Sequence, residues 1–168
     1  IQYLIDAIHL LVKDHEIIDS GLNIQLNIAG SGTQKKYLEE KVEELGLGKN
    51  ILFHGHISNA KLGKLLEKTD IVALASLSES FGVSAIEAMS CGIPVVATDA
   101  DGFKEVILNG QTGIIVGKKS SVELYEALKK LILNKELRQK MGKKGRQHVE
   151  ENYNFSKNVD EMIRIYKK

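Results

Sequence analysis

Two carboxylates and a glycine lie close together near the middle of the sequence. Glu79 follows an apolar run of strand length, and Glu87 lies eight positions later within an expected helix. Gly82 is expected to begin that helix, so the backbone N–H groups of Val83 and Ser84 should lack intrahelical partners. Free amides at a helix start bind anions such as a diphosphate, and a carboxylate accepts two hydrogen bonds from a vicinal diol. This combination predicts a site for a nucleotide-sugar, which carries both a diphosphate and diols.

Apolar runs of strand length alternate with helical patterns along the chain. We expect strands at 22–28, 51–53, 71–75, 95–97 and 113–116. We expect helices at 1–12, 34–45, 82–90, 103–107, 135–151 and 155–166, and two more after the capping residues Ser58 and Ser120, the latter in a capping box with Glu123. The alternation predicts an α/β fold, with a mostly parallel, doubly wound Rossmann-like sheet and helices on both of its faces. Without an internal repeat or linker, residues 1–168 are expected to form a single domain.

Four expected loops follow the carboxyl ends of strands, where open parallel sheets bind their ligands. These loops are 29–33, 54–58, 76–82 and 98–103. Their glycine and polar residues are Gly30, Gly32, His54, His56, Ser76, Glu79, Gly82, Asp99 and Asp101. The strand before the third loop, IVALA, has no polar residue and is expected to be buried on both faces. The sequence therefore places the functional site at this edge of the sheet.

The composition is that of a folded globular protein and excludes several classes of function. Of 168 residues, 43% are hydrophobic, and 23 Lys and Arg balance 22 Asp and Glu, which gives no reason to expect a nucleic-acid partner. The lone Cys91 cannot form an internal disulfide, which fits a cytoplasmic protein. No apolar run could span a bilayer, and no signal peptide is visible. Because Ile1 falls within a helical pattern, we expect that residues before it have been removed.

The stretch SLSESFGVSAIEAMSCGIPVVAT carries a family signature. It resembles the E-x7-E motif of retaining family 4 glycosyltransferases, with Glu79 and Glu87 in the two motif positions. Three further segments resemble the same family, namely NIAGSG at 27–32, ILFHGHIS at 51–58 and ADGFKEVILNGQTGIIV at 100–116. The resemblance covers nearly the whole chain. It implies the C-terminal, donor-binding half of the GT-B fold, truncated at its N-terminus, with the N-terminal acceptor domain missing.

The resemblance also implies roles for the residues around the motif. Glu87 would accept hydrogen bonds from the ribose hydroxyls of the donor. Glu79 would bind hydroxyls of the transferred sugar and stabilise positive charge at the anomeric carbon. The amides of Val83 and Ser84, after Gly82, would hold the phosphates of a UDP-sugar or GDP-sugar. The implied chemistry is hexosyl transfer with retention of configuration, which requires no metal and no cofactor, to a glycan or lipid-linked acceptor.

Residues from the other loops complete the donor site that the resemblance implies. Gly30 and Gly32 would let the backbone approach the nucleotide, and the backbone at His56 and Ile57 would border the base. Phe81 belongs to the same nucleotide-sugar-binding set as the motif residues. The isolated domain is expected to be inactive, because acceptor binding and domain closure need the missing half.

The sequence departs from the family pattern at three places. Ala75 replaces a proline, and Asp101 stands where the first glycine of a Gly-Gly pair is common, which leaves only Gly102. The family places a phosphate-clamping Arg and Lys, and a central strand, before the position of Ile1. Without that strand, the closure of the sheet has no explanation from the sequence.

Several features permit a second interpretation. The basic stretch from Lys135 to His148 is typical of a solvated helix face. It could also form a patch that binds a membrane surface, which would suit a lipid acceptor. His54 and His56 alternate as metal ligands could, but no third ligand is identifiable. Cys91, at a helix end, reads as a small packed residue. For the function, the alternatives are a sugar-nucleotide epimerase or phosphorylase of the same architecture, and a non-catalytic nucleotide-sugar-binding module.

Overall fold

Parallel strands form two separate sheets in the computed structural model, which describes residues 1–154 and 163–165. One sheet pairs β1 (Leu26–Ala29) with β2 (Ile51–Gly55). The other has the order β3 (Val72–Leu74), β4 (Val95–Thr98) and β5 (Gly113–Val116). All pairings between these strands are parallel, which confirms the predicted α/β fold. The strands do not join into the single sheet that the alternation predicted.

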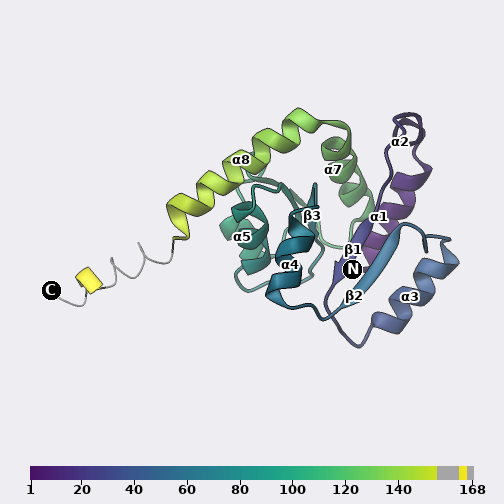
Figure 1. Cartoon of the computed structure of the whole chain (residues 1–168), viewed down its shortest axis with the longest axis horizontal. Coiled ribbons are helices and arrows are strands. Elements are labelled where there is room, and N and C mark those ends of the chain that lie inside the picture. Colours follow the sequence, from purple (N-terminus) through teal and green to yellow (C-terminus); the bar gives the residue numbers. More distant parts are fainter. Residues whose placement is uncertain (155–162, 166–168) are drawn as a thin grey trace.

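The helices between the strands agree with the sequence pattern, with one addition. Their bounds are α1 (Gln2–Lys13), α2 (His15–Asp19), α3 (Lys35–Glu44), α4 (Asn59–Leu66), α5 (Val83–Ser90), α6 (Asp101–Val106), α7 (Ser121–Leu133) and α8 (Lys135–Asn152). The short α2 was not predicted. The helix predicted at 155–166 lies outside the described residues, apart from 163–165, which are helical. Figure 1 shows α1 and α7 side by side, and α8 running across α5.

Helices cover both faces of the larger sheet, and β4 shows this in its side chains. Val96 packs into a core cluster with α1 and α7, whereas Val95 and Ala97 pack into a second cluster with α5 and α6. Successive residues of a strand point to opposite faces, so the two clusters lie on opposite sides of β4. This arrangement is the doubly wound one that the sequence predicts.

The strand β3 is less buried than its apolar sequence predicts. Residues 71–74 are only half-buried, whereas every residue of β4 is buried. The difference follows from pairing, because β4 has a neighbour on each side and β3 pairs only with β4. The predicted strand at 22–28 is also shorter than expected, since β2 begins opposite Leu26 and leaves 22–25 without a partner strand.

The predicted helix caps form only in part. Ser120 Oγ accepts a hydrogen bond from the Glu123 amide at 3.2 Å, as in a capping box. The Glu123 carboxylate does not complete the box, because it accepts from the Gly117 amide at 2.7 Å. Ser58 is the N-cap residue of α4, but its side chain makes no capping hydrogen bond.

Asp14 links the unpredicted helix α2 to α7. Its Oδ1 accepts hydrogen bonds from the amides of Glu16 and Ile17, at 2.9 and 3.2 Å, and so caps α2. Its Oδ2 accepts from Lys129 Nζ at 2.9 Å and from the Tyr125 hydroxyl. The hydrogen bonds from Lys129 and then Tyr125 hold the pKa of the Asp14 carboxyl well below its usual range. The charge of Asp14 is therefore favoured in the folded state.

Replacing Asp14 by asparagine should make the melting temperature less dependent on acid pH. The lowered pKa of Asp14 stabilises the fold above the pKa of the unfolded carboxyl, about 3.9, and this stabilisation is lost as the pH falls further. The wild type should therefore lose more stability between pH 7 and pH 3 than Asp14→Asn does. Thermal unfolding at both pH values measures the effect, with Asp19→Asn at the other end of α2 as the control. Equal losses in Asp14→Asn and wild type would contradict this account.

Candidate functional site

The loop between β3 and α5 brings Glu79 to the start of a helix. Gly82, the N-cap residue, has a φ of 89°, and a Cβ there would lie 3.1 Å from the Gly102 carbonyl oxygen, so glycine is required. Glu79 Oε1 accepts a hydrogen bond from the Gly82 amide at 3.3 Å. The Glu79 carbonyl accepts a second from the Gly102 amide at 3.0 Å. The Glu79 carboxylate therefore lies against the helix start where the sequence predicted a phosphate.

The first amides of α5 are available to a ligand. The first hydrogen bonds of the helix are those that the amides of Ala85 and Ile86 donate to the carbonyl of Gly82, at 2.9 and 3.2 Å. Val83 and Ser84 are exposed, and their amides have no hydrogen-bond partner in the part of the chain that the structure describes. This agrees with the prediction of free donors at the helix start.

Glu87 lies one turn further along α5 than Val83 and Ser84. It is exposed, and its spacing of four and three residues from Val83 and Ser84 places the three on one helix face. Ser84 and Glu87 both line a cavity of about 640 Å³. The other predicted site residues do not line this cavity, although Ala29, next to Gly30, does.

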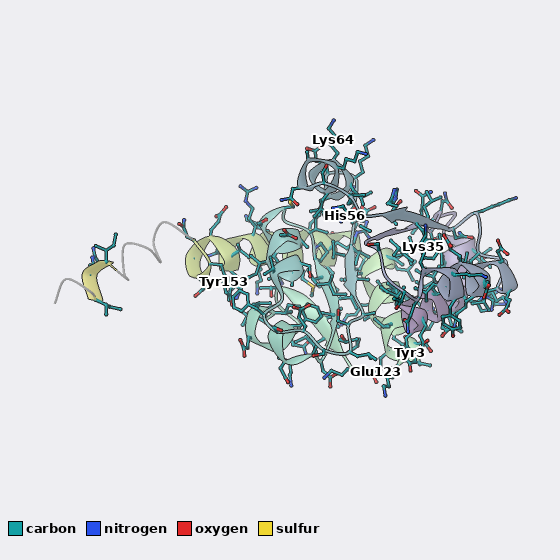
Figure 2. All side chains as sticks on the ribbon, turned by 90° about the horizontal axis from the view of Figure 1, so that it is seen from below. Tyr3, Lys35, His56, Lys64, Glu123 and Tyr153 are labelled. Atoms are coloured by element: carbon teal, nitrogen blue, oxygen red, sulfur yellow. The ribbon has the colours of Figure 1, made fainter. Side chains whose placement is uncertain are left out.

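The predicted base-binding residues form a second group at the ends of β1 and β2. The Gly30 amide donates to the Gly55 carbonyl at 2.7 Å, and both glycines have positive φ, 126° and 63°. This bond holds the loop with Gly32 beside the loop with His56 and Ile57. His56 is exposed and lies, in the view of Figure 2, between Lys64 of α4 and Lys35 of α3. Among the described residues, no hydrogen bond joins this group to the one around α5.

Gly102 supports the Glu79 loop by its lack of a side chain. A Cβ at Gly102 would lie 2.5 Å from the Phe81 amide nitrogen, so the loop could not approach α6 in its present position. In the sequence, Gly102 was identified only as the glycine left where a Gly-Gly pair is common in the family, and its contact with Phe81 could not be predicted. Asp101, the departure beside it, forms an ion pair with Lys104 at 2.8 Å. Lys104 and then Lys118 lower the pKa of Asp101, so its charge is balanced locally.

Phe81 is held by a residue from the end of α8. Its ring, 45% exposed, makes an edge contact with Tyr153 at a centroid distance of 6.1 Å. The Tyr153 hydroxyl donates to the Glu105 carbonyl at 3.3 Å, and burial raises its pKa. Tyr153 thus connects α8, α6 and the Glu79 loop, a contact between distant segments that the sequence did not predict; Figure 2 shows it at the end of α8.

Thr98 holds the beginning of the same loop from β4. Its hydroxyl donates to the Ser76 carbonyl at 2.5 Å, and the side chain is 1% exposed. This role could not be predicted, because a threonine at a strand end has no specific sequence signal.

Replacing Thr98 by valine should destabilise the protein by about 1–3 kcal/mol, because the Ser76 carbonyl loses its buried donor. Thr98→Ser keeps the hydroxyl and loses one methyl group, for a cost of about 0.8 kcal/mol. Urea unfolding of both variants measures the difference. If serine were as destabilising as valine, packing of the methyl group and not the hydrogen bond would be what Thr98 contributes.

The structure revises one other interpretation of the sequence, that of Cys91. Cys91 is exposed at the end of α5, where it is the C-cap residue, so the prediction of a packed cysteine is wrong. His54 Nε2 lies 2.8 Å from Asn27 Oδ1, so the side chain of His54 contacts β1. Within residues 1–154 and 163–165, no group of three or more His, Cys, Asp or Glu side chains is arranged to hold a metal ion.

The basic stretch forms most of α8. Lys135, Lys140, Lys143, Lys144 and Arg146 are exposed, and Arg146 pairs with Glu150 at 2.8 Å. Arg138 turns inward and donates to the carbonyls of Leu131 and Ile132 at 2.6 and 2.7 Å. The lysines thus remain available to an anionic partner. No helix in the described part of the chain has the length and apolar character needed to cross a bilayer.

Comparisons with known proteins give the chain a family. Residues 1–148 match the family described as Glycosyl transferases group 1. The uncharacterized glycosyltransferase MJ1607 of Methanocaldococcus jannaschii is 30% identical over 167 residues, which are 99% of this chain and 41% of that protein. The D-inositol 3-phosphate glycosyltransferase of Gordonia bronchialis is 32% identical over 139 residues, which are 82% of this chain and 30% of that protein. The chain therefore spans less than half the length of these relatives.

A solved structure agrees with the family match. The C-terminal domain of the glycosyl transferase group 1 family protein LpcC from Francisella tularensis superposes with a TM-score of 0.79 at 31% identity, over 92% of this chain and 79% of that one. Both the resemblance in the sequence and the predicted Rossmann-like fold are confirmed. The chain belongs to the group 1 family of glycosyl transferases and has the fold of the C-terminal domain of a GT-B enzyme.

Proposed function

We propose that this chain is the donor-binding domain of a retaining glycosyltransferase, which transfers a hexosyl unit from a UDP-sugar or GDP-sugar to a glycan or a lipid-linked acceptor. The observation that carries the proposal is the start of α5. The amides of Val83 and Ser84 open this helix and have no hydrogen-bond partner among the described residues, Glu87 is exposed one turn further on, and Ser84 and Glu87 border a common cavity. The amides suit a diphosphate, and the carboxylate suits the diol of a ribose.

Glu79 has a different part in this proposal. Without ligand its carboxylate accepts from the Gly82 amide at a long 3.3 Å, a weak contact that a bound phosphate and sugar can replace. Turned toward the sugar, Glu79 accepts hydrogen bonds from its hydroxyls and stabilises positive charge at the anomeric carbon as the bond to the diphosphate breaks. The helix amides stabilise the leaving diphosphate, so the reaction needs no metal. The loop of Phe81 and Gly82 keeps both groups in place.

The remaining donor contacts come from the loops after β1 and β2. The backbone at Gly30 and Gly32 has no Cβ and permits close approach of the nucleotide, and the backbone at His56 and Ile57 borders the base. Transfer also needs an N-terminal acceptor domain, so residues 1–168 alone are expected to bind a donor without transferring its sugar. Exposed lysines of α8 suit an enzyme that works in the cytoplasm at the surface of a membrane with a lipid-linked acceptor.

A nucleotide panel tests the proposal on the complete polypeptide. Calorimetry with UDP, GDP, UDP-glucose and GDP-mannose, each with and without EDTA, should show one base preferred and no effect of the chelator. Product analysis with and without an added acceptor then separates the chemistries. An epimerase converts the donor without an acceptor, and a binding module converts nothing. Absence of binding by all four compounds would refute the proposal.

A further inference from the structure

The strand β5 lies at the outer edge of the larger sheet and pairs with β4 on its inner side. The Val116 carbonyl accepts a hydrogen bond from the Asp99 amide at 2.8 Å, so the backbone groups of Val116 point toward β4. Successive residues of a strand direct these groups to opposite sides, so those of Gly113, Ile115 and Gly117 point outward. We call this outward side the β5 edge. An open edge of this kind is a template to which another chain can add a strand.

A turn just before β5 folds back along the β5 edge. The Gly110 amide donates to the Gly113 carbonyl at 2.8 Å, and Asn109 forms an isolated bridge with Gly113. Gly110 has a φ of 75°, which glycine adopts without strain and which allows the reversal. From this turn, Asn109 Oδ1 accepts a hydrogen bond from the Ile115 amide at 2.9 Å. The outward amide in the middle of the strand therefore already has a partner within the chain.

Glu123 provides a partner for the next outward amide, from the first turn of α7. Its Oε2 accepts a hydrogen bond from the Gly117 amide at 2.7 Å. A Cβ at Gly117 would lie 2.9 Å from Glu123 Oε1, so the lack of a side chain there gives the carboxylate room. Glu123 is exposed, and Figure 2 labels it at the surface of the molecule. A hydrogen bond to a carboxylate is stronger than one between neutral groups, so this acceptor is hard to displace.

An apolar groove beside the β5 edge would favour an added strand if these amides were free. A cavity of about 490 Å³ lies between β5, α7 and α8. Its apolar lining includes Ile114 and Val116 of β5 and Val122 of α7, whose side chain is 59% exposed. Asn109 and Glu123 border the same cavity. The side chains of an added strand could bury apolar surface here, so the two polar residues lie where they can oppose that addition.

We propose that Asn109 and Glu123 close the β5 edge and thereby prevent a second copy of this chain from adding its own β5 to the sheet. A second copy is the partner that fits, because two identical edges related by a twofold axis pair antiparallel and make the same contacts on both sides. Such a strand must displace both side chains and separate the Glu123 carboxylate from its donor. The proposal concerns association alone and does not depend on the proposed function.

Alanine at both positions removes the two acceptors and tests the proposal on the complete polypeptide. In sedimentation velocity, Asn109→Ala/Glu123→Ala should show about a doubling of the mean mass at concentrations at which the mass of the wild type is constant. Asn109→Asp/Glu123→Gln keeps an acceptor oxygen at each position and the same net charge, so its mass should equal that of the wild type. Glu126→Ala is the matched control, because Glu126 is an exposed acid that lines the same cavity without being one of the two acceptors.

Gly117→Ala opens the β5 edge by a milder change. The added Cβ would meet only the end of the flexible Glu123 side chain, so the carboxylate should move off the amide while the fold persists. This variant should also associate, though at higher concentration than the alanine pair does. If the alanine pair does not fold, Gly117→Ala decides the question. A folded form of either variant that keeps the mass of the wild type would overturn the proposal.

Hydrogen exchange shows whether association occurs at the β5 edge. In the wild type, the amides of Ile115 and Gly117 should exchange at least about tenfold more slowly than in an unstructured chain, because side chains accept from them. In the alanine pair, both amides should lose this protection in dilute protein and regain it where the variant associates. Association that leaves both amides unprotected would occur elsewhere on the molecule and would also overturn the proposal.

Discussion

Glu87→Gln is expected to weaken the binding of a nucleoside diphosphate about 10- to 100-fold. Glu87 is exposed one turn after Val83 and Ser84, whose amides have no partner among the described residues, and its carboxylate can accept two hydrogen bonds from a ribose diol. Hydrogen bonds to a charged group contribute about 1.5–3 kcal/mol, and about 1.4 kcal/mol changes an affinity tenfold. Glutamine keeps the size of the side chain but offers one acceptor oxygen without charge.

Calorimetry on the complete polypeptide measures this effect, with UDP or GDP according to the base preferred. The control Glu126→Gln changes an exposed acid on α7, away from the α5 helix face. A 2′,3′-dideoxy analogue of the same nucleotide supplies a second control, because it has no diol. Wild type and Glu87→Gln should bind this analogue equally. If Glu87→Gln lost as much affinity for the dideoxy analogue as for the natural nucleotide, Glu87 would not contact the ribose.

The order of strands and helices could be predicted because each element carries its own periodic pattern. The run GIIV gives β5 at Gly113–Val116, as predicted, and β4 extends the predicted 95–97 by one residue. The division into two sheets could not be predicted in the same way. It depends on which edges meet, and a strand such as β3 has the same apolar sequence whether one or both of its edges are paired.

The site was predictable where chemistry depends on local backbone geometry. The free amides of Val83 and Ser84 follow from the position of Gly82 at a helix start, and they are present. The direction of the Glu79 side chain was not predictable, because a loop carboxylate can turn toward its own helix or toward a ligand. The supports from Thr98 and Tyr153 escaped prediction for another reason, since they join segments that only the tertiary fold brings together.

Glu79→Gln is expected to lower kcat of the complete enzyme by about 100- to 1,000-fold while changing the KM for the donor much less. A group that stabilises charge developing in the transition state contributes on this scale, and its loss affects kcat more than ground-state binding. Glutamine can still accept a hydrogen bond from the Gly82 amide, which Glu79 Oε1 does at 3.3 Å, so the loop should keep its conformation. The effect on rate then reports the lost charge.

Steady-state kinetics with varied donor concentration separates this prediction from the one for Glu87. If Glu87 binds the ribose, which does not change charge during the reaction, then Glu87→Gln should raise the KM of the donor with a smaller effect on kcat. Glu79→Gln should instead lower kcat with a smaller effect on the KM of the donor. Unchanged thermal unfolding of Glu79→Gln is the control for folding. A variant that retains more than about a third of the wild-type kcat would show that the charge of Glu79 is not used in the reaction, because a charge lost from the transition state must change the rate far more than that.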